Sequence, residues 1–379
     1  MMMLVNCSSC HTPLQMPPGA TSISCVICRA ITNIVDPRSA PPAPPSPYPP
    51  TNPSSSFNGY NNNYYPPPPP VAPSSYHHAA PPSSYGRKKA VIVGISYKNT
   101  KSELKGCIND AKCMKHMLVS RFMFPESSIL MLTEEETDPY RIPTKSNIRL
   151  AMFWLVQGCQ PGDSLVFHYS GHGSQQRNYT GDEIDGYDET LCPLDYETQG
   201  MIVDNEINAT IVRPLPPGVK LHAIIDACHS GTVLDLSYLC RMDRTGRYTW
   251  EDQRPKTGTW KGTSGGEAIS FSGCDDDQTS ADTAAMSKVT STGVMTFAFI
   301  QAIEQGQGAT YGSILSAMRS TIRKTNNELG GGGGGGDPMT TLLTMLLSGG
   351  SAGASGGLTQ VPQLCANEQF DVYTKPFSL

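Results

Sequence analysis

A proline-rich stretch divides this chain and limits where it can build a core. Seventeen of the 32 prolines lie between residues 37 and 86, where Arg38 is the one charged residue and aliphatic side chains are scarce. Such a segment cannot bury enough apolar surface to offset the entropy lost on ordering, so we expect residues 37–86 to be a disordered linker. The full-sized core must therefore be built from the residues that follow.

Beyond the linker, apolar runs typical of buried strands alternate with helix-like segments. The predicted strands cover residues 89–95, 127–132, 164–169, 219–226, 267–272 and 340–347. The predicted helices cover residues 104–118, 144–157, 294–304 and 311–326. This alternation favours an α/β fold, in which a mainly parallel sheet is flanked by helices. The basic residues 241–261 have little apolar pattern and are expected to be irregular, and the glycine run 330–336 is expected to be a surface loop.

Two predicted strands end in residues suited to nucleophilic catalysis. The segment DSLVFHYSGHGS carries His172 just past one strand, and LHAIIDACHSG carries Cys228 just past another. Strand ends meet at one edge of an open α/β sheet, so the two side chains can converge. A thiolate beside an imidazole can attack an amide carbonyl, and N–H groups around Cys228 and Gly173 could form an oxyanion hole. Taken singly, a buried structural thiol and an ordinary loop histidine are the simpler interpretations. His168 and His222 lie inside predicted strands and are poorer partners.

Four cysteines near the start of the chain have the spacing of zinc ligands. They form two C-x-x-C pairs: Cys7, Cys10, Cys25 and Cys28. A segment as short as residues 1–36 could not hold a fold without a metal, so we expect a Cys₄ zinc finger there. The finger is not basic, which favours protein contact or autoinhibition over nucleic-acid binding.

Together these motifs resemble those of metacaspases, the caspase-like proteases of plants, fungi and protists. HYSGHGS and DACHSG match the catalytic motifs of the family, and a zinc finger before a proline-rich region matches its type I plant branch. The resemblance covers essentially the whole chain. It implies a p20-like catalytic part at residues 87–240, a basic processing linker at 241–264 and a p10-like part at 265–379. It also implies a cysteine endopeptidase made as a zymogen, with a role in programmed cell death or stress and defence responses.

The surroundings of the thiol point to a basic substrate side chain. Asp226 lies two residues before Cys228 and should point to the same side, where its carboxylate would attract a cation and repel aspartate. The resemblance adds Asp110, Ser170 and Cys107 as walls of a pocket for arginine or lysine at P1. The simpler interpretation of Asp110 is an acid on a helix surface or at a helix cap.

An acidic stretch follows the predicted catalytic histidine. Residues 182–206 include nine acidic residues and no lysine or arginine, a crowding of carboxylates that solvent or a cation must compensate. A hard divalent ion with oxygen ligands suits such a stretch. The resemblance implies activation by calcium and points to these ligands: Asp188, Asp204, Asn205 and Asp235. The alternative is a solvated acidic loop.

Nothing in the sequence indicates a membrane or nucleic-acid partner. The net charge is −5, no apolar run approaches roughly 18 residues, and no signal-peptide pattern is present. We therefore expect a monomeric catalytic unit in the cytoplasm, with the nucleus as a second compartment, that cuts protein substrates after Arg or Lys. Its own basic segment 241–261 is an expected cleavage site. The competing hypothesis is a catalytically idle scaffold whose zinc finger and proline-rich tract bind partners.

Overall fold

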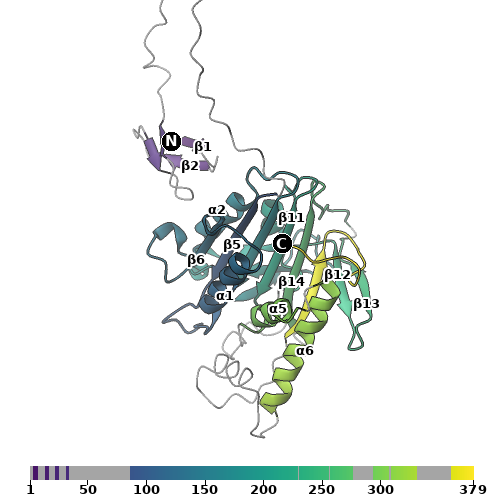
Figure 1. Ribbon diagram of the computed structural model, residues 1–379. Coiled ribbons are helices and arrows are strands. Elements are labelled where there is room, and N and C mark those ends of the chain that lie inside the picture. The colour runs from purple at the N-terminus through teal and green to yellow at the C-terminus, as the bar shows by residue number, and fades with distance from the viewer. Residues whose placement is uncertain are drawn as a thin grey trace, which may run out of the picture.

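An eight-stranded sheet organises the chain after residue 86 (Figure 1). The computed structural model describes residues 3–6, 13–16, 22–24, 31–33, 86–228, 230–255, 257–275, 293–306, 309–330 and 360–379. In spatial order the strands are β13 (Tyr248–Asp252), β12 (Tyr238–Met242), β15 (Gln360–Ala366), β14 (Glu267–Asp275), β11 (Lys220–Asp226), β7 (Ser164–Ser170), β5 (Lys88–Gly94) and β6 (Ile129–Thr133). The strands from β14 to β6 run parallel, whereas β12, β13 and β15 pair antiparallel. The predicted mainly parallel sheet is confirmed.

The central strands are continuous apolar runs because both of their faces are covered. In β5, Val91 and Val93 pack into one hydrophobic core, while Ala90 and Ile92 pack into the other. The first core includes Ile148 and neighbouring apolar residues of α2 (Lys145–Val156). The second core is covered by α1 (Cys107–Ser120), α5 (Val294–Glu304) and α6 (Tyr311–Gly330), which lie in front of the sheet in Figure 1.

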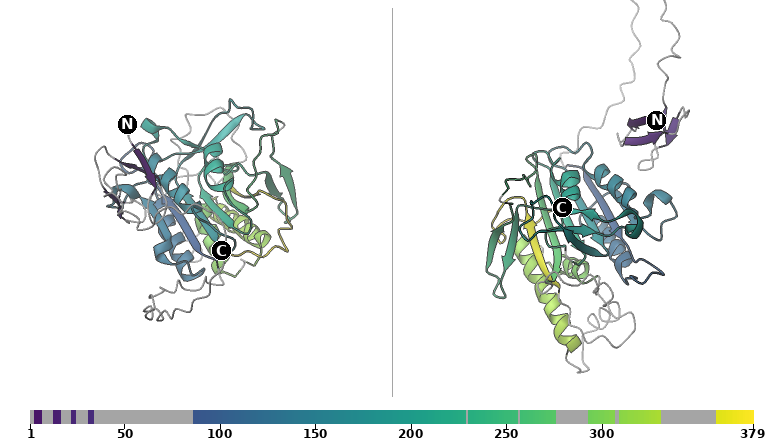
Figure 2. Two further views of the ribbon diagram at one scale, coloured as in Figure 1. Left: turned by 90° about the horizontal axis from the view of Figure 1, so that it is seen from above. Right: turned by 180° about the vertical axis from the view of Figure 1, so that it is seen from behind.

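Shorter elements complete the described part of the chain, which Figure 2 shows from two further sides. A small sheet, β8 (Gly173–Arg177), β9 (Tyr187–Leu191) and β10 (Ile202–Val203), follows β7 in sequence. The short helical turns are η1 (Glu126–Ser128), η2 (Pro139–Arg141), α3 (Tyr196–Gln199), α4 (Asp204–Ile207) and η3 (Asn208–Val212). Near the start of the chain, β1 (Met3–Asn6) pairs with β2 (Pro13–Met16), and β3 (Ser22–Ser24) with β4 (Ile31–Asn33). No described helix is long and apolar enough to cross a bilayer.

The basic segment is more regular than its sequence predicts. Residues 241–252 were expected to be irregular, but most of them belong to the antiparallel hairpin of β12 and β13. Buried Cys240 and Met242 alternate with exposed Arg241, which is the pattern of a strand with one solvated face. The charged residues on the outer face weaken the apolar pattern, so the alternation was not recognised in the sequence. Strand β15 was not predicted, and the expected strand at 340–347, the glycine run and the proline-rich linker lie outside the described residues.

Candidate active site

The two residues singled out as a catalytic pair follow neighbouring parallel strands. Ser170 of β7 and Asp226 of β11 are register partners, and His172 and Cys228 each lie two residues further along. The amide of Gly171 donates to the carbonyl of Asp226 over 3.2 Å, so the chains stay together past the strand ends. The structure therefore brings the two residues to the same edge of the sheet.

Gly173 allows the backbone after His172 to pass close to the backbone of Cys228. A Cβ atom at Gly173 would lie 2.1 Å from the carbonyl oxygen of Cys228, an impossible contact for any other residue. Gly173 is also the first residue of β8, which leads away from the site. The glycine is thus required by a close approach of two backbones, and not by an unusual φ angle.

His172 is 6% exposed, and its ring is oriented by a backbone carbonyl. Its Nε2 lies 2.8 Å from the carbonyl oxygen of Ser102, in the loop between β5 and α1. A carbonyl can only accept, so Nε2 carries the proton and Nδ1 keeps a free lone pair for proton transfer. Burial lowers the pKa of His172, although the bond to Ser102 opposes this, so the neutral imidazole is favoured.

Two buried tyrosines hold the backbone of His172. Its N–H donates to the hydroxyl of Tyr97 over 3.0 Å, and the two rings pack with their centroids 4.7 Å apart. The hydroxyl of Tyr169 donates to the carbonyl of His172 over 2.9 Å. Neither tyrosine nor Ser102 was among the predicted site residues. A backbone carbonyl leaves no signal in sequence, and the tyrosines resemble ordinary core residues.

The acids of the predicted P1 pocket are buried beside each other. Asp110 on α1 is 7% exposed and accepts a hydrogen bond of 2.8 Å from the hydroxyl of Ser170. Burial, and then the charge of Asp226, raise the pKa of Asp110 well above its usual range. Cys107, three residues earlier on α1, is also buried. The burial of Asp110 excludes the simpler interpretation of a surface acid.

Asp226 is fully buried and contacts the beginning of α5. Its Oδ2 accepts a 2.7 Å hydrogen bond from the backbone N–H of Thr296. The Oδ1 atom of Asp226 has no hydrogen-bond partner among the described residues. Burial raises the pKa of the Asp226 carboxyl group. In the described part of the chain no basic side chain forms an ion pair with Asp110 or Asp226. The two carboxylates are therefore buried together without a basic counter-charge among the described residues.

The other strand histidines are core residues. Nδ1 of His168 donates to the carbonyl of Ile224 over 2.9 Å, and Nε2 of His222 lies 2.7 Å from the hydroxyl of Tyr311. Burial lowers the pKa of His168 to about 4 and that of His222 to about 3. Both are neutral and turned into the protein, as their positions inside strands predict.

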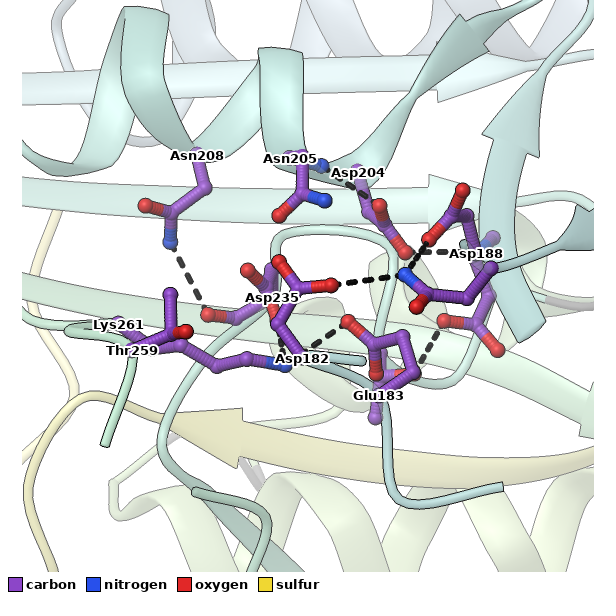
Figure 3. Close-up of polar contacts among 12 residues, drawn as sticks. Asp182, Glu183, Asp188, Asp204, Asn205, Asn208, Asp235, Thr259 and Lys261 are labelled. Atoms are coloured by element: carbon purple, nitrogen blue, oxygen red, sulfur yellow. Dashed lines mark hydrogen bonds and ion pairs between the residues drawn. The ribbon is translucent and has the colours of Figure 1, made fainter. Parts of the chain in front are cut away.

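The acidic stretch folds into a cluster that includes the four residues named as calcium ligands. Figure 3 shows Asp188, Asp204, Asn205 and Asp235 gathered around the carboxylate of Asp182, with Glu183 beside them. Carboxylate oxygens of Asp182, Glu183 and Asp188 lie within 4.8 Å of one another. Sequence reasoning missed Asp182 and Glu183 as members of this group, although both lie in the stretch whose charge it noticed.

The cluster has donors that suit a hard divalent cation. Burial, and then neighbouring carboxylates, raise the pKa of Asp204 to about 9. Burial likewise raises the pKa of Glu183 to about 8, against the effect of a bonded lysine. Oδ2 of Asp235 is buried and has no hydrogen-bond partner among the described residues. Crowded carboxylates with an orphaned oxygen fit the oxygen ligands that calcium prefers.

The backbone at Asp235 connects the cluster to the loop that bears Cys228. Asp235 has φ 53, a left-handed conformation that aspartate adopts more readily than most residues. The amide of Asn208 donates to the carbonyls of Leu234 and Asp235, each over 3.0 Å. The hydroxyl of Thr232, in the same loop, donates to Glu189 over 2.6 Å. The loop after Cys228 is thus bonded to Glu189 and Asn208, which follow the cluster residues Asp188 and Asp204 in the chain.

Two models of known protein families match separate parts of the chain. The family model described as metacaspase, peptidase C14 domain, matches residues 88–237, and the model of the LSD1 zinc finger matches residues 7–31. The second match spans Cys7, Cys10, Cys25 and Cys28, which lie outside the described residues.

Similar proteins occur in plants and fungi. Metacaspase-1 of Arabidopsis thaliana is 66% identical over 378 residues, covering 100% of this chain and 96% of that protein. Metacaspase-2 of the same plant is 58% identical over 418 residues, covering all of both chains. Metacaspase-1 of the fungus Eremothecium gossypii is 40% identical over 280 residues, covering 63% of this chain and 62% of that protein.

Proposed function

This chain is a type I plant metacaspase, and therefore a caspase-like cysteine protease, in which we propose that Cys228 is the nucleophile and His172 moves the protons. The observation that carries this assignment is the register pairing of Ser170 with Asp226. Because His172 and Cys228 each follow one of these partners by two residues, they lie at equal distances past the ends of adjacent strands. The bond from Nε2 of His172 to Ser102 supports it, since it leaves Nδ1 as the proton acceptor.

The reaction follows from these groups. Nδ1 of His172 takes the proton of the thiol, and the Cys228 thiolate attacks the carbonyl carbon of the scissile peptide bond. Backbone N–H groups around Cys228 and Gly173 stabilise the oxyanion. The imidazolium then gives its proton to the leaving amine, and water hydrolyses the resulting thioester.

The substrate residue at P1 is arginine or lysine. Asp110 and Asp226 are buried carboxylates without a basic partner in the described residues, so a cationic side chain would relieve an unfavourable charge. An aspartate at P1 would add a third negative charge to the same pocket and should be rejected.

Calcium activates the enzyme, and Asp188, Asp204, Asn205 and Asp235 would hold it. It would supply the positive charge that the crowded carboxylates lack. The attachment of the Cys228 loop to the cluster through Thr232 and Asn208 supports a role in ordering the nucleophile. Self-processing within residues 241–264 follows from a P1 preference for basic residues. The four amino-terminal cysteines hold a structural zinc.

The biological assignment rests on the family. We propose that this protease acts in programmed cell death or in stress and defence responses, in the cytoplasm and nucleus, on protein substrates. The zinc finger would contact protein partners.

Peptidase assays test the proposed function directly. In the presence of calcium, the enzyme should cleave peptides with Arg or Lys at P1 and leave matched Asp peptides intact. Cys228→Ala should abolish cleavage, and His172→Ala should reduce it by about three orders of magnitude or more. Asp110→Asn should lower kcat/KM for Arg peptides, whereas Cys113→Ala, an exposed thiol on the same helix, is the matched control. Full activity of Cys228→Ala, or equal cleavage after Asp and Arg, would refute the assignment.

A further inference from the structure

A lysine from a distant segment is buried in the acidic cluster. The side chain of Lys261 is 2% exposed, and its ammonium group pairs with Glu183 at 2.8 Å and with Asp235 (Figure 3). Lys261 follows the β12–β13 hairpin in an irregular stretch and is separated from Glu183 by 78 residues. Lysine is almost never fully buried unless it is paired, so this placement depends on the carboxylates around it.

Lys261 is held in this position by two carboxylates. Its ammonium group forms ion pairs with Glu183 and Asp235, so it places a positive charge among the acidic residues. The ammonium is therefore a monovalent cation that is covalently tethered within the cluster. Among the described residues, the basic side chain that forms ion pairs with this cluster is Lys261.

The ammonium and a divalent cation would share the carboxylate of Asp235. Asp235 is one of the proposed calcium ligands, and Glu183 belongs to the group of carboxylates within 4.8 Å of one another. Two cations on one carboxylate repel each other strongly when both are shielded from water. Lys261 also leaves Oδ2 of Asp235 unpaired, so it compensates the cluster incompletely. The cluster can thus hold either the lysine or a divalent ion at Asp235.

We propose that Lys261 is an intramolecular competitor of calcium, which holds the acidic cluster in the calcium-free protein and must leave before calcium binds. This inference rests on the proposed calcium site. Departure of Lys261 would free the stretch around it, which includes Trp260, already 56% exposed, and the exposed Arg254. Calcium binding would then also expose the basic segment to proteolysis. A single ion could in this way control both the active site and self-processing.

Calcium titration of the full chain tests the competition. All proteins carry Cys228→Ala so that none can process itself, and binding is followed by calorimetry. Lys261→Gln should bind calcium about tenfold tighter or more, because the competing charge is gone. Its calcium-free form should unfold at a lower temperature, since the buried carboxylates lose their counter-charge. Arg254→Gln, which removes a surface charge of the same segment, should match the parent protein in both measurements.

Lys261→Arg provides a second variant that keeps the charge. A guanidinium can pair with carboxylates through two parallel hydrogen bonds, so calcium should bind this variant no more tightly than the parent protein. Limited trypsin digestion gives an independent readout. Calcium should accelerate cleavage within residues 241–264 of the parent protein, and Lys261→Gln should be cleaved quickly without calcium.

The outcomes separate the two proposals. If the parent protein binds calcium and Lys261→Gln binds it equally or more weakly, the lysine does not compete, and the inference fails while the calcium site stands. If none of the proteins binds calcium, both the site and the competition are wrong.

Discussion

At the scale of single residues, the position of His172 depends on the hydroxyl of Tyr97. Tyr97→Phe removes the acceptor of the buried N–H of His172 and leaves it unpaired, a loss of about 1–3 kcal/mol. We expect kcat for Arg peptides to fall about tenfold with little change in KM, because Tyr97 contacts the histidine and not the acidic pocket. Tyr140→Phe, at a tyrosine that is 51% exposed, is the control. A rise in KM at constant kcat would show that Tyr97 acts on substrate binding instead.

The pH dependence of catalysis reports the same histidine. In the proposed mechanism the neutral imidazole is the base, so activity should be present above the pKa of His172 and lost as pH falls through it. Because burial lowers that pKa, the acid limb of the kcat/KM profile should lie below pH 6.5, the ordinary value for histidine. A limb above that value would contradict the buried, carbonyl-bonded geometry.

Individual residues show which parts of the site can be predicted from the sequence and which cannot. His172 and Cys228 could be predicted because each directly follows an apolar strand, and parallel strands bring their ends together. Ser102 contributes a backbone oxygen, which any residue could supply. Lys261 reaches Glu183 from 78 residues away, and its sequence neighbours indicate only a basic loop.

At the scale of elements, the beginning of α5 is attached to β11 through Asp226. Asp226→Asn keeps an oxygen that can accept from the N–H of Thr296, whereas Asp226→Ala leaves that buried donor unpaired. We expect Asp226→Ala to lower the free energy of unfolding by about 3 kcal/mol, and Asp226→Asn to change it much less. Both variants should lose preference for Arg at P1. Urea unfolding measures the difference in stability between the two variants. Equal destabilisation by both substitutions would contradict the role of the bond to Thr296.

Elements were predictable where their sequences form continuous apolar runs. Helix α5 begins and ends where predicted, at residues 294 and 304, because it is apolar around most of its surface. The β12–β13 hairpin was missed because its outer face is charged, and β15 because a proline and two glutamines interrupt its short apolar run.

At the scale of the whole molecule, the chain from residue 86 onward builds one folded unit, with a hydrophobic core on each face of its sheet in the described part. Arg87 already belongs to this unit, since its N–H and side chain both bond Asp163. A truncated protein of residues 87–379 should therefore unfold cooperatively and keep peptidase activity.

The full chain should contain one zinc per molecule, which truncation removes and a chelator releases without unfolding the catalytic part. Equal zinc content in both proteins would place the metal elsewhere.

Covalent labelling can establish whether Cys228 attacks substrates whose P1 side chain is held by the acidic residues Asp110 and Asp226. The full-length protein is treated in calcium with a thiol-reactive peptide probe carrying Arg at P1, or with the same probe carrying Asp, and the labelled residue is identified by mass spectrometry. We expect one adduct, on Cys228, from the Arg probe and none from the Asp probe, with labelling lost in Asp110→Asn and His172→Ala. Labelling of another cysteine, or equal labelling of Cys228 by both probes, would contradict it.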